Sequence, residues 1–335
     1  MNVVCAEELH CLIDLHLHLD GSLPLPCVRR LAAMQGIPLP AEDEELRRQL
    51  AVGPDCRDLN EYLERFALPL SLLQTPESLT VAVQELQQTL MAQGVQYAEI
   101  RFAPQLHGEK GMTQSEAVRA AAAGLGYHGF RAGLILCCMR GADNHEANME
   151  TVRVAAEYAG RGVCAVDLAG AEALFKTADF AAEFALAREM GLRFTIHAGE
   201  ADGPESIRTA LSFGAKRIGH GVRSAEDPAL VRLLAEKQIP LELCPTSNLN
   251  TAMFARLADH PLPQLLAAGV RATVNTDNTT VSDTTLRREY QNLIDAFALT
   301  RQQVRTLLQN AAEAAFTDEA TRAQLLAAIG AELAE

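Results

Sequence analysis

A short leucine-rich segment near the N-terminus carries four residues that could do chemistry. Residues 12–20 read LIDLHLHLD, in which Asp14, His16, His18 and Asp20 alternate with apolar side chains. Because successive side chains of a β-strand point to opposite faces, all four would share one face of a strand. An edge strand with one solvated face would explain the alternation, but two histidines spaced in this way can also bind one metal ion.

Three more residues of this kind stand at or just after the ends of apolar runs later in the chain. His197 lies in TIHAGE, His220 in RIGHG and Asp277 in VNTDN. Imidazole nitrogen and carboxylate oxygen suit Zn²⁺, and also Fe²⁺ or Mn²⁺. Such a metal would lower the pKa of a bound water towards ~7, and Glu200, three residues after His197, could exchange a proton beside it. We expect the remaining histidines to be ordinary surface or capping residues: His10, His107, His128, His145 and His260.

Eight short apolar runs would position these residues, and we interpret each run as a β-strand. Amphipathic stretches separate most of them, and alternating strands and helices predict a parallel sheet. Eight such units favour a closed (β/α)₈ barrel, or TIM barrel, in which functional residues gather at the C-terminal ends of the strands. The runs cover residues 12–19, 95–103, 132–139, 163–169, 192–198, 216–221, 239–245 and 270–276.

The stretches between the runs predict helices with recognisable ends. In residues 177–191 Thr177 would cap a helix that Gly191 terminates, and Asp227 followed by a proline would begin a helix over residues 227–238. The chain after residue 300 predicts two closing helices. We therefore expect one α/β barrel domain over residues 1–335, with a helical insertion after the first strand at about residues 20–94 and extra C-terminal helices.

That insertion carries an apolar stripe. Leu59, Tyr62, Leu63 and Phe66 follow the spacing i, i+3, i+4 and i+7 of one helix face. Core packing is the usual reason for such a stripe, and an apolar lid over a pocket is the alternative.

Composition narrows the class of protein. A net charge of -14 argues against binding nucleic acid or an anionic membrane through bulk electrostatics. The sequence has no run of 18 apolar residues and no basic start followed by an apolar core, so we expect neither a membrane span nor a signal peptide. None of the eight cysteines forms a C-x-x-C pair, and we expect most of them to be small buried residues of a cytoplasmic protein.

One motif imitates a nucleotide-binding site. GLGYHG at residues 124–129 matches G-x-G-x-x-G, which binds dinucleotides when it follows a strand and opens a helix. Here it follows a helical stretch and precedes a strand, so we interpret it as a turn.

Taken in order, the motifs of this chain resemble the adenosine deaminase family of metal-dependent amidohydrolases. The matching pieces are DLHLHLDGS, YAEIRFAP, LCCMRG, VDLAGAE, TIHAGE, RIGHG, ELCPTSN and VNTDN, between residues 14 and 278. The resemblance implies a (β/α)₈ barrel with one catalytic zinc. It makes His16, His18, His197 and Asp277 the metal ligands.

The same resemblance implies roles in a hydrolytic reaction on a purine nucleoside. Glu200 would protonate N1 of the purine ring, while His220 and Asp277 would align or deprotonate a zinc-activated water that attacks C6. His18, Asp20 and Gly170 would contact the substrate, with Asp20 on a ribose hydroxyl and the Gly170 N–H on the purine. Adenosine and 2′-deoxyadenosine would become inosine and 2′-deoxyinosine, with release of ammonia.

This chain departs from the family pattern at one position. The family usually follows the metal aspartate with a second aspartate that contacts purine N7, and here Asn278 takes that position. An aspartate must be protonated to donate to N7, whereas an asparagine offers its NH₂ group at every relevant pH. Asn278 could keep the contact, or it could merely cap the following loop.

Other activities remain compatible with the motifs. Adenine, an N6-modified adenine nucleotide or an aminofutalosine-type nucleoside would undergo the same ring chemistry. A non-catalytic nucleoside-binding relative should have lost Glu200, His220 or a metal ligand, and all of these are present. A binuclear site would call for a lysine at the end of the fourth strand, where the nearest lysine is Lys176. Cytidine-type deaminases use an H-x-E motif together with a P-C-x-x-C motif, and the two do not occur as a set in this sequence.

Overall fold

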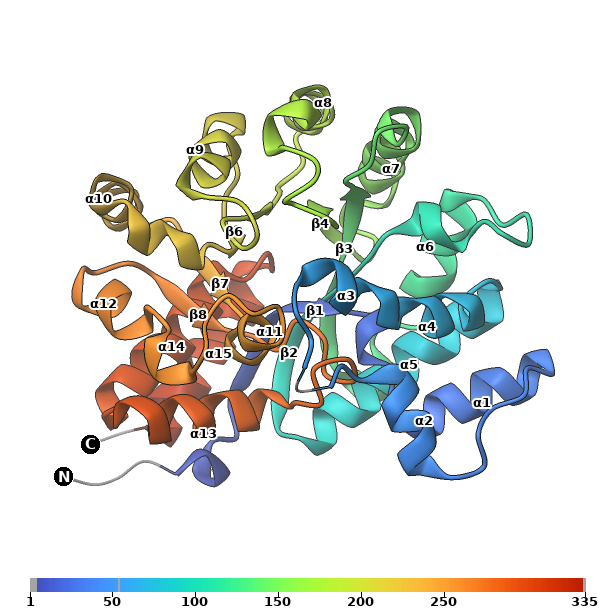
Figure 1. The fold of residues 1–335 in the computed structure, drawn as a ribbon, viewed down its shortest axis with the longest axis horizontal. Helices are drawn as coiled ribbons and strands as arrows, with labels where there is room; N and C mark the ends of the chain where they lie inside the picture. Colours follow the sequence, from blue (N-terminus) through green and yellow to red (C-terminus); the bar gives the residue numbers. More distant parts are fainter. Residues whose placement is uncertain (1–4, 54, 334–335) are drawn as a thin grey trace.

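Eight parallel strands form the centre of the molecule, with helices around them (Figure 1). The computed structural model describes residues 5–53 and 55–333. The strands make two four-stranded sheets, in the orders β1-β2-β3-β4 and β5-β6-β7-β8. Their bounds are β1 Leu12–His18, β2 Val95–Phe102, β3 Arg131–Met139, β4 Val163–Ala169, β5 His197–Ala198, β6 Ile218–His220, β7 Leu241–Leu243 and β8 Ala272–Val274.

Isolated bridges join the two sheets at both seams. Val166 of β4 pairs with Phe194 ahead of β5, and Leu17 of β1 pairs with Asp277 after β8. At the second seam the His18 N–H donates to Asp277 O at 2.8 Å, and the Asp277 N–H donates to His16 O at 2.8 Å. The strands therefore follow one another around a barrel, which confirms the predicted (β/α)₈ architecture.

The last four strands are shorter than the apolar runs that predicted them. The run at residues 192–198 contributes only the two residues of β5 to a ladder. Its earlier residues make isolated backbone hydrogen bonds to β4 instead of a continuous ladder; for example, the Thr195 N–H donates to Val166 O at 3.1 Å. An apolar run reports burial, and burial extends beyond the stretch in which consecutive residues pair.

Burial on both faces distinguishes β1 from an edge strand. Leu15 and Leu17 pack in the hydrophobic core, while Asp14 and His16, on the opposite face, are also fully buried. The barrel interior covers one face and the surrounding helices cover the other. The interpretation of the alternation as one solvated face is therefore wrong.

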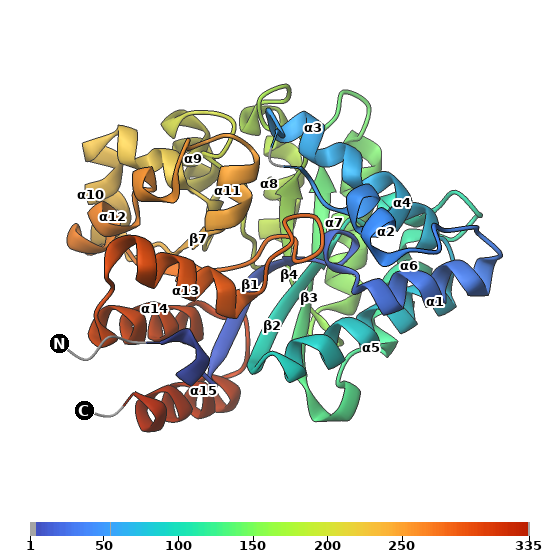
Figure 2. The same cartoon turned by 60° about the horizontal axis from the view of Figure 1, so that its bottom comes forward.

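The described residues form fifteen α-helices, which lie around the strands. Figure 2 shows α1, α2 and α4 of the insertion grouped on one side of the strands, and α13, α14 and α15 on the other. The bounds are α1 Leu25–Gln35, α2 Asp43–Leu50, α3 Leu59–Leu63, α4 Ala67–Leu72, α5 Pro76–Ala92, α6 Gln114–Ala123, α7 His145–Tyr158, α8 Ala181–Glu189, α9 Pro204–Phe213, α10 Pro228–Lys237, α11 Pro245–Asn250, α12 Leu262–Ala267, α13 Leu286–Phe297, α14 Arg301–Ala314 and α15 Glu319–Glu332. None of the helices in the described part of the chain combines the length and hydropathy needed to span a membrane.

The two predicted helix starts have different outcomes. Asp227 caps α10 by accepting from the N–H groups of Ala229 and Leu230, as expected. Thr177 does not cap α8, which begins four residues later after a 3₁₀ turn. The Thr177 hydroxyl instead contacts Ser206 Oγ at 2.7 Å and accepts from the Arg140 guanidinium at 3.0 Å. A tertiary contact has replaced the local cap.

Two other sequence interpretations can be compared with the fold. GLGYHG lies between α6 and β3 and forms a turn in which Gly126 has φ +74°, as predicted. His107 and His260 are buried rather than on the surface. The Nδ1 atom of His107 lies 3.0 Å from Leu73 O, and that of His260 accepts from the Leu262 N–H at 3.2 Å.

Candidate active site

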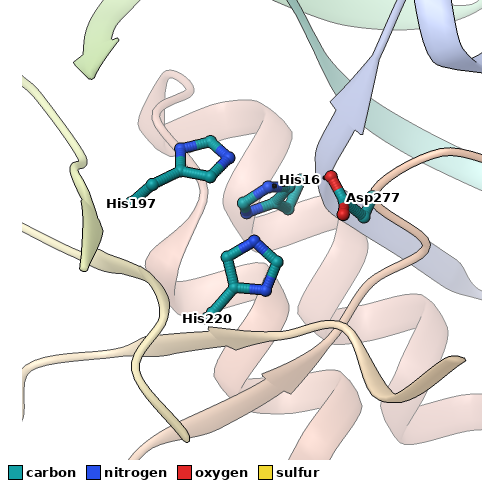
Figure 3. A group of neighbouring side chains, drawn as sticks. All are labelled: His16, His197, His220 and Asp277. Carbon is teal, nitrogen blue, oxygen red and sulfur yellow. Dashed lines mark ion pairs between the residues drawn. The ribbon is translucent and has the colours of Figure 1, made fainter. Parts of the chain in front are cut away.

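Three histidines and an aspartate from four separate parts of the barrel meet in one cluster (Figure 3). His16 comes from β1, His197 from β5, His220 from β6, and Asp277 follows β8. One side-chain ligand atom from each lies within 4.8 Å of those of the other three. His220 and Asp277 have φ +57° and φ +61°, a left-handed backbone that costs energy in residues with a Cβ and is concentrated at functional sites.

His18, a predicted metal ligand, lies at the edge of this cluster. Its Nε2 atom is 3.2 Å from Nε2 of His197 and 3.4 Å from Oδ1 of Asp277. His16 Nε2 lies 3.4 Å from the same carboxylate oxygen. The structure thus brings all four predicted ligands together, with His220 beside them.

The donor atoms fit a divalent metal ion. His16 Nε2 is buried without a hydrogen-bond partner, an expensive state for a polar atom unless a further ligand completes it. Burial lowers the pKa of His18 and His220 well below the usual value, so both imidazoles are neutral with a lone pair available. Although burial opposes it, contact with the histidines, His16 foremost, keeps the pKa of Asp277 low and the carboxylate ionised.

Buried carboxylates contact the Nδ1 atoms of two of these histidines, on the side of each ring away from the cluster. Glu242 Oε2 of β7 lies 2.8 Å from His16 Nδ1, and Asp167 Oδ2 of β4 lies 2.9 Å from His197 Nδ1 in a bent contact. Arg101 donates to both carboxylates, each at 2.9 Å. Carboxylates behind metal-binding histidines fix the orientation of the ring. The sequence analysis did not identify these three residues. A charged residue within an apolar run, as in RFA, VDLA and LELCP, could have indicated them.

The short helix α11 supplies partners that sequence reasoning also missed. Ser247 Oγ donates to Asp277 Oδ2 at 2.6 Å, and Asn248 Nδ2 lies 3.1 Å from His220 Nδ1. These contacts leave the other oxygen of Asp277 and the Nε2 edge of His220 facing the cluster. The motif ELCPTSN contains both residues, but hydroxyl and amide side chains in a turn give no distinctive sequence signal.

Glu200 sits next to the cluster, 3% exposed. Its Oε2 atom is 3.6 Å from His220 Nε2, and its Oε1 atom accepts from the Thr251 hydroxyl at 3.3 Å. Burial, together with the nearby charges of Asp277 and Glu172, raises the pKa of Glu200 well above its usual value. The raised pKa favours the protonated form of Glu200, whereas the low pKa of Asp277 favours its carboxylate. Neighbouring groups whose pKa values are shifted in opposite directions are typical of acid–base chemistry.

A cavity opens over this cluster. Its lining includes Asp20, Glu200, His220 and Asp277 beside many apolar side chains. The predicted stripe of the insertion also faces it: Leu59, Tyr62, Leu63 and Phe66. Such a mostly apolar pocket with a few polar groups is the usual form of a small-molecule site.

The remaining predicted contacts also lie in this cavity. Gly170, at φ +102°, and Asn278 both line it, as does His18. The Asn278 side chain lies so close to Gly21 that a Cβ on Gly21 would be 1.7 Å from Asn278 Oδ1. The N–H of Thr279 donates to Ser22 Oγ and that of Thr280 to Gly21 O. These backbone N–H groups, which a capping Asn278 would have bound, therefore have other acceptors.

Comparisons with known proteins agree with this geometry. The sequence model of the adenosine deaminase family matches residues 11–332. An adenosine deaminase of Haemophilus ducreyi is 51% identical over 326 residues, covering 95% of each chain. The crystal structure of an adenine deaminase from Arthrobacter aurescens has a TM-score of 0.88 at 30% identity, covering 96% of this chain and 99% of the other.

A more distant structure supports the fold alone. An amidohydrolase of Burkholderia ambifaria, solved with bound zinc, has a TM-score of 0.86 at 23% identity and covers 99% of this chain and 94% of its own. The family match over nearly the whole chain and the identity to the Haemophilus ducreyi enzyme lead to one conclusion. This chain is a member of the adenosine deaminase family.

Proposed function

We propose that this enzyme hydrolytically deaminates adenosine and 2′-deoxyadenosine, and that it uses one zinc ion per chain. The observation that carries the proposal is the position of a buried carboxyl group with a raised pKa, Glu200, beside a cluster of side chains that could hold a metal ion in one small-molecule cavity. The 51% identical relative is an adenosine deaminase, whereas the 30% identical structure is an adenine deaminase, and the higher identity supports the nucleoside as the substrate.

Zinc held by His16, His18, His197 and Asp277 would lower the pKa of a water and so supply a nucleophile at neutral pH. His220 would orient that water, because its Nε2 edge faces the cluster while Asn248 holds its Nδ1. Glu200 would donate its proton to purine N1, which makes C6 electrophilic. The water oxygen would bond to C6 and make it tetrahedral. A proton from that water would pass to the exocyclic amino group, the C6–N bond would break, and ammonia would leave the 6-oxopurine behind.

The remaining cavity residues would bind and shield the substrate. Asp20 and His18 would contact the ribose, the backbone N–H of Gly170 would donate to the purine, and Asn278 would donate to N7. Leu59 and Phe66 would cover the apolar faces of the bound nucleoside and exclude bulk water. Excluding water strengthens the electrostatic contacts in the site.

A steady-state panel tests the substrate assignment. Ammonia release would be measured with adenosine, 2′-deoxyadenosine, adenine and N6-methyl-AMP, using protein whose metal content is known. We expect kcat/KM to be highest for the two nucleosides. A higher kcat/KM for adenine or for the nucleotide would replace the proposed substrate, and no turnover of any of them by zinc-loaded protein would contradict deamination.

A further inference from the structure

A buried carboxylate outside the cavity organises the loop that carries Glu200. Glu172 follows β4 and is 1% exposed. Its Oε2 atom accepts from the backbone N–H groups of Glu200 at 3.0 Å, Ala201 at 2.7 Å and Asp202 at 3.0 Å. Its Oε1 atom accepts from the Gly199 N–H at 2.7 Å. One side chain thus binds four consecutive backbone N–H groups of residues 199–202.

The rest of the loop is built around this contact. The Ser206 hydroxyl at the start of α9 donates to Glu172 Oε1 at 2.6 Å, which gives the carboxylate a fifth donor. Gly199 has φ +71°, and a Cβ there would lie 2.4 Å from Cδ1 of Ile207. The backbone is therefore wound into a tight arc whose N–H groups point inward, a form that binds anions.

Side chains connected to this loop through Ser206 also fix the backbone of His197, a proposed metal ligand. Arg140 donates to His197 O at 2.7 Å and to Thr177 Oγ1 at 3.0 Å. Thr177 in turn contacts Ser206 Oγ at 2.7 Å. Because β5 has only two residues in its ladder, these side chains do the positioning that a longer strand would otherwise provide.

We propose that Glu172 is a positioning residue, which acts on the reaction by holding the loop at residues 199–202 so that the Glu200 side chain points into the cavity. It does not line that cavity. Its effect is transmitted through the backbone of Glu200, whose N–H it binds directly. The role deepens the proposed deamination and rests on it for its effect on kcat, whereas the loop contact itself can be measured without any substrate.

Five donors make the carboxylate difficult to replace. Glutamine has nearly the same shape, but it offers one acceptor oxygen and turns an NH₂ group towards at least one of the N–H groups. Two facing donors repel, and a buried N–H without an acceptor costs the full desolvation of the group. In Glu172→Gln the loop should therefore open more often, and displacements of ~1 Å at a reacting group can cost ~10²-fold in rate.

The first arm of the test measures the loop without substrate. Hydrogen exchange of the peptide containing residues 199–202 should be faster in Glu172→Gln than in the wild type. Glu183→Gln is the matched control. Glu183 lies on α8 and is equally buried, but its Oε1 atom contacts Nδ1 of His145, at 3.1 Å, and not the loop. Its loop exchange and kcat should be those of the wild type. Unchanged loop exchange in Glu172→Gln would overturn the proposal.

The second arm separates positioning from a general structural role. Glu172→Gln should lower kcat by about 10–100-fold with a smaller change in KM and unchanged zinc content. In a Glu200→Gln background the same change should lower kcat by less than about 3-fold, because residues acting through one group are non-additive. An equal loss in both backgrounds would show that Glu172 does not act through Glu200.

Two further outcomes concern a variant that does not fold and a wild type that does not deaminate. If Glu172→Gln fails to fold, Ser206→Ala removes one donor and retains the carboxylate, and it should show a milder rise in exchange and a few-fold loss of kcat. Wild-type exchange and kcat in Ser206→Ala would then count against the proposal. If the wild type deaminates none of the 6-aminopurines, the proposed function fails, while the exchange result still decides whether Glu172 holds the loop.

Discussion

The Nε2 atoms of His18 and His197 lie 3.2 Å apart, on side chains that come from the first and the fifth strand. Burial lowers the pKa of both imidazoles, so neither ring carries a charge. Two neutral imidazole nitrogens at this distance either share one proton or turn both lone pairs towards a cation. The ionised Asp277 and the unpartnered His16 Nε2 beside them favour the cation.

The first prediction concerns that cation. Elemental analysis of protein purified without added metal should find about one zinc per chain, and a strong chelator should abolish turnover until zinc is restored. His18→Ala should lower the zinc content, whereas His145→Ala, on the exposed start of α7, should not. Two metal equivalents required for turnover, or full activity after verified removal, would contradict the mononuclear site.

The second prediction concerns Glu200, the proposed proton donor. Glu200→Gln should fold and retain zinc but lose ~10²–10⁴-fold in kcat, the usual contribution of a general acid–base group. Glutamine keeps the shape and can still accept from Thr251, but it cannot deliver a proton to N1. A zinc-loaded variant with a near-normal rate would show that Glu200 has only a structural role.

The third prediction concerns the hydroxyl that contacts this acid. Thr251 Oγ1 lies 3.3 Å from Glu200 Oε1 and 3.1 Å from Ser247 O. The hydroxyl donates to both oxygens, and its bond to Glu200 should strengthen if Glu200 gives up its proton, because an ionised acceptor makes a stronger hydrogen bond. Thr251→Val should therefore lower kcat by about 3–10-fold, the value of one hydrogen bond, while Thr251→Ser keeps the hydroxyl and most of the rate. Equal rates in the valine and serine variants would remove this role.

The fourth prediction concerns Asn278. If its amide donates to purine N7, Asn278→Leu should weaken kcat/KM for adenosine by about 3–10-fold and weaken it less for 7-deazaadenosine, which lacks the acceptor. Asn278→Asp should retain deamination but lose kcat/KM more steeply as pH rises, because the aspartate must stay protonated to donate. Equal losses of both substrates in the leucine variant would show that Asn278 does not contact N7.

The fifth prediction concerns the pH dependence of stability. Burial raises the pKa of Glu289 on α13 from 4.5 to about 7. Between these values the folded chain holds a proton that the unfolded chain has lost, so this group makes stability fall as pH rises from about 4.5 to 7. The fall should be of the order of 2–3 kcal/mol, and it should be smaller in Glu289→Gln.

Urea unfolding of the two proteins at pH 5 and pH 8 measures this difference. Glutamine cannot ionise, so the variant should gain stability relative to the wild type at the higher pH. A constant difference between the two proteins at both pH values would show that Glu289 does not titrate in this range. The substitution lies outside the cavity lining, so zinc content should not change.

Sequence patterns predicted the architecture because they report local physics. Period-two alternation predicted the strand that carries His16 and His18, and His197, His220 and Asp277 were placed at or just after the ends of later apolar runs. Parallel barrel strands bring their C-terminal ends to one face, so residues spaced over more than two hundred positions could be assigned to one cluster. The order of helix, GLGYHG and strand was enough to reject a dinucleotide site.

Tertiary structure decided what each polar side chain contacts. Thr177 had the sequence of a helix cap, yet Ser206 and Arg140 became its partners once α9 and β3 lay beside it. Asp167 and Glu242 could be located on strands, but their pairing with His197 and His16 depends on how the barrel closes. Burial of both faces of β1 likewise follows from closure, because a single strand cannot show what will cover it. Hydrophobic periodicity is a property of neighbouring residues, whereas a hydrogen-bond partner is a property of the folded chain.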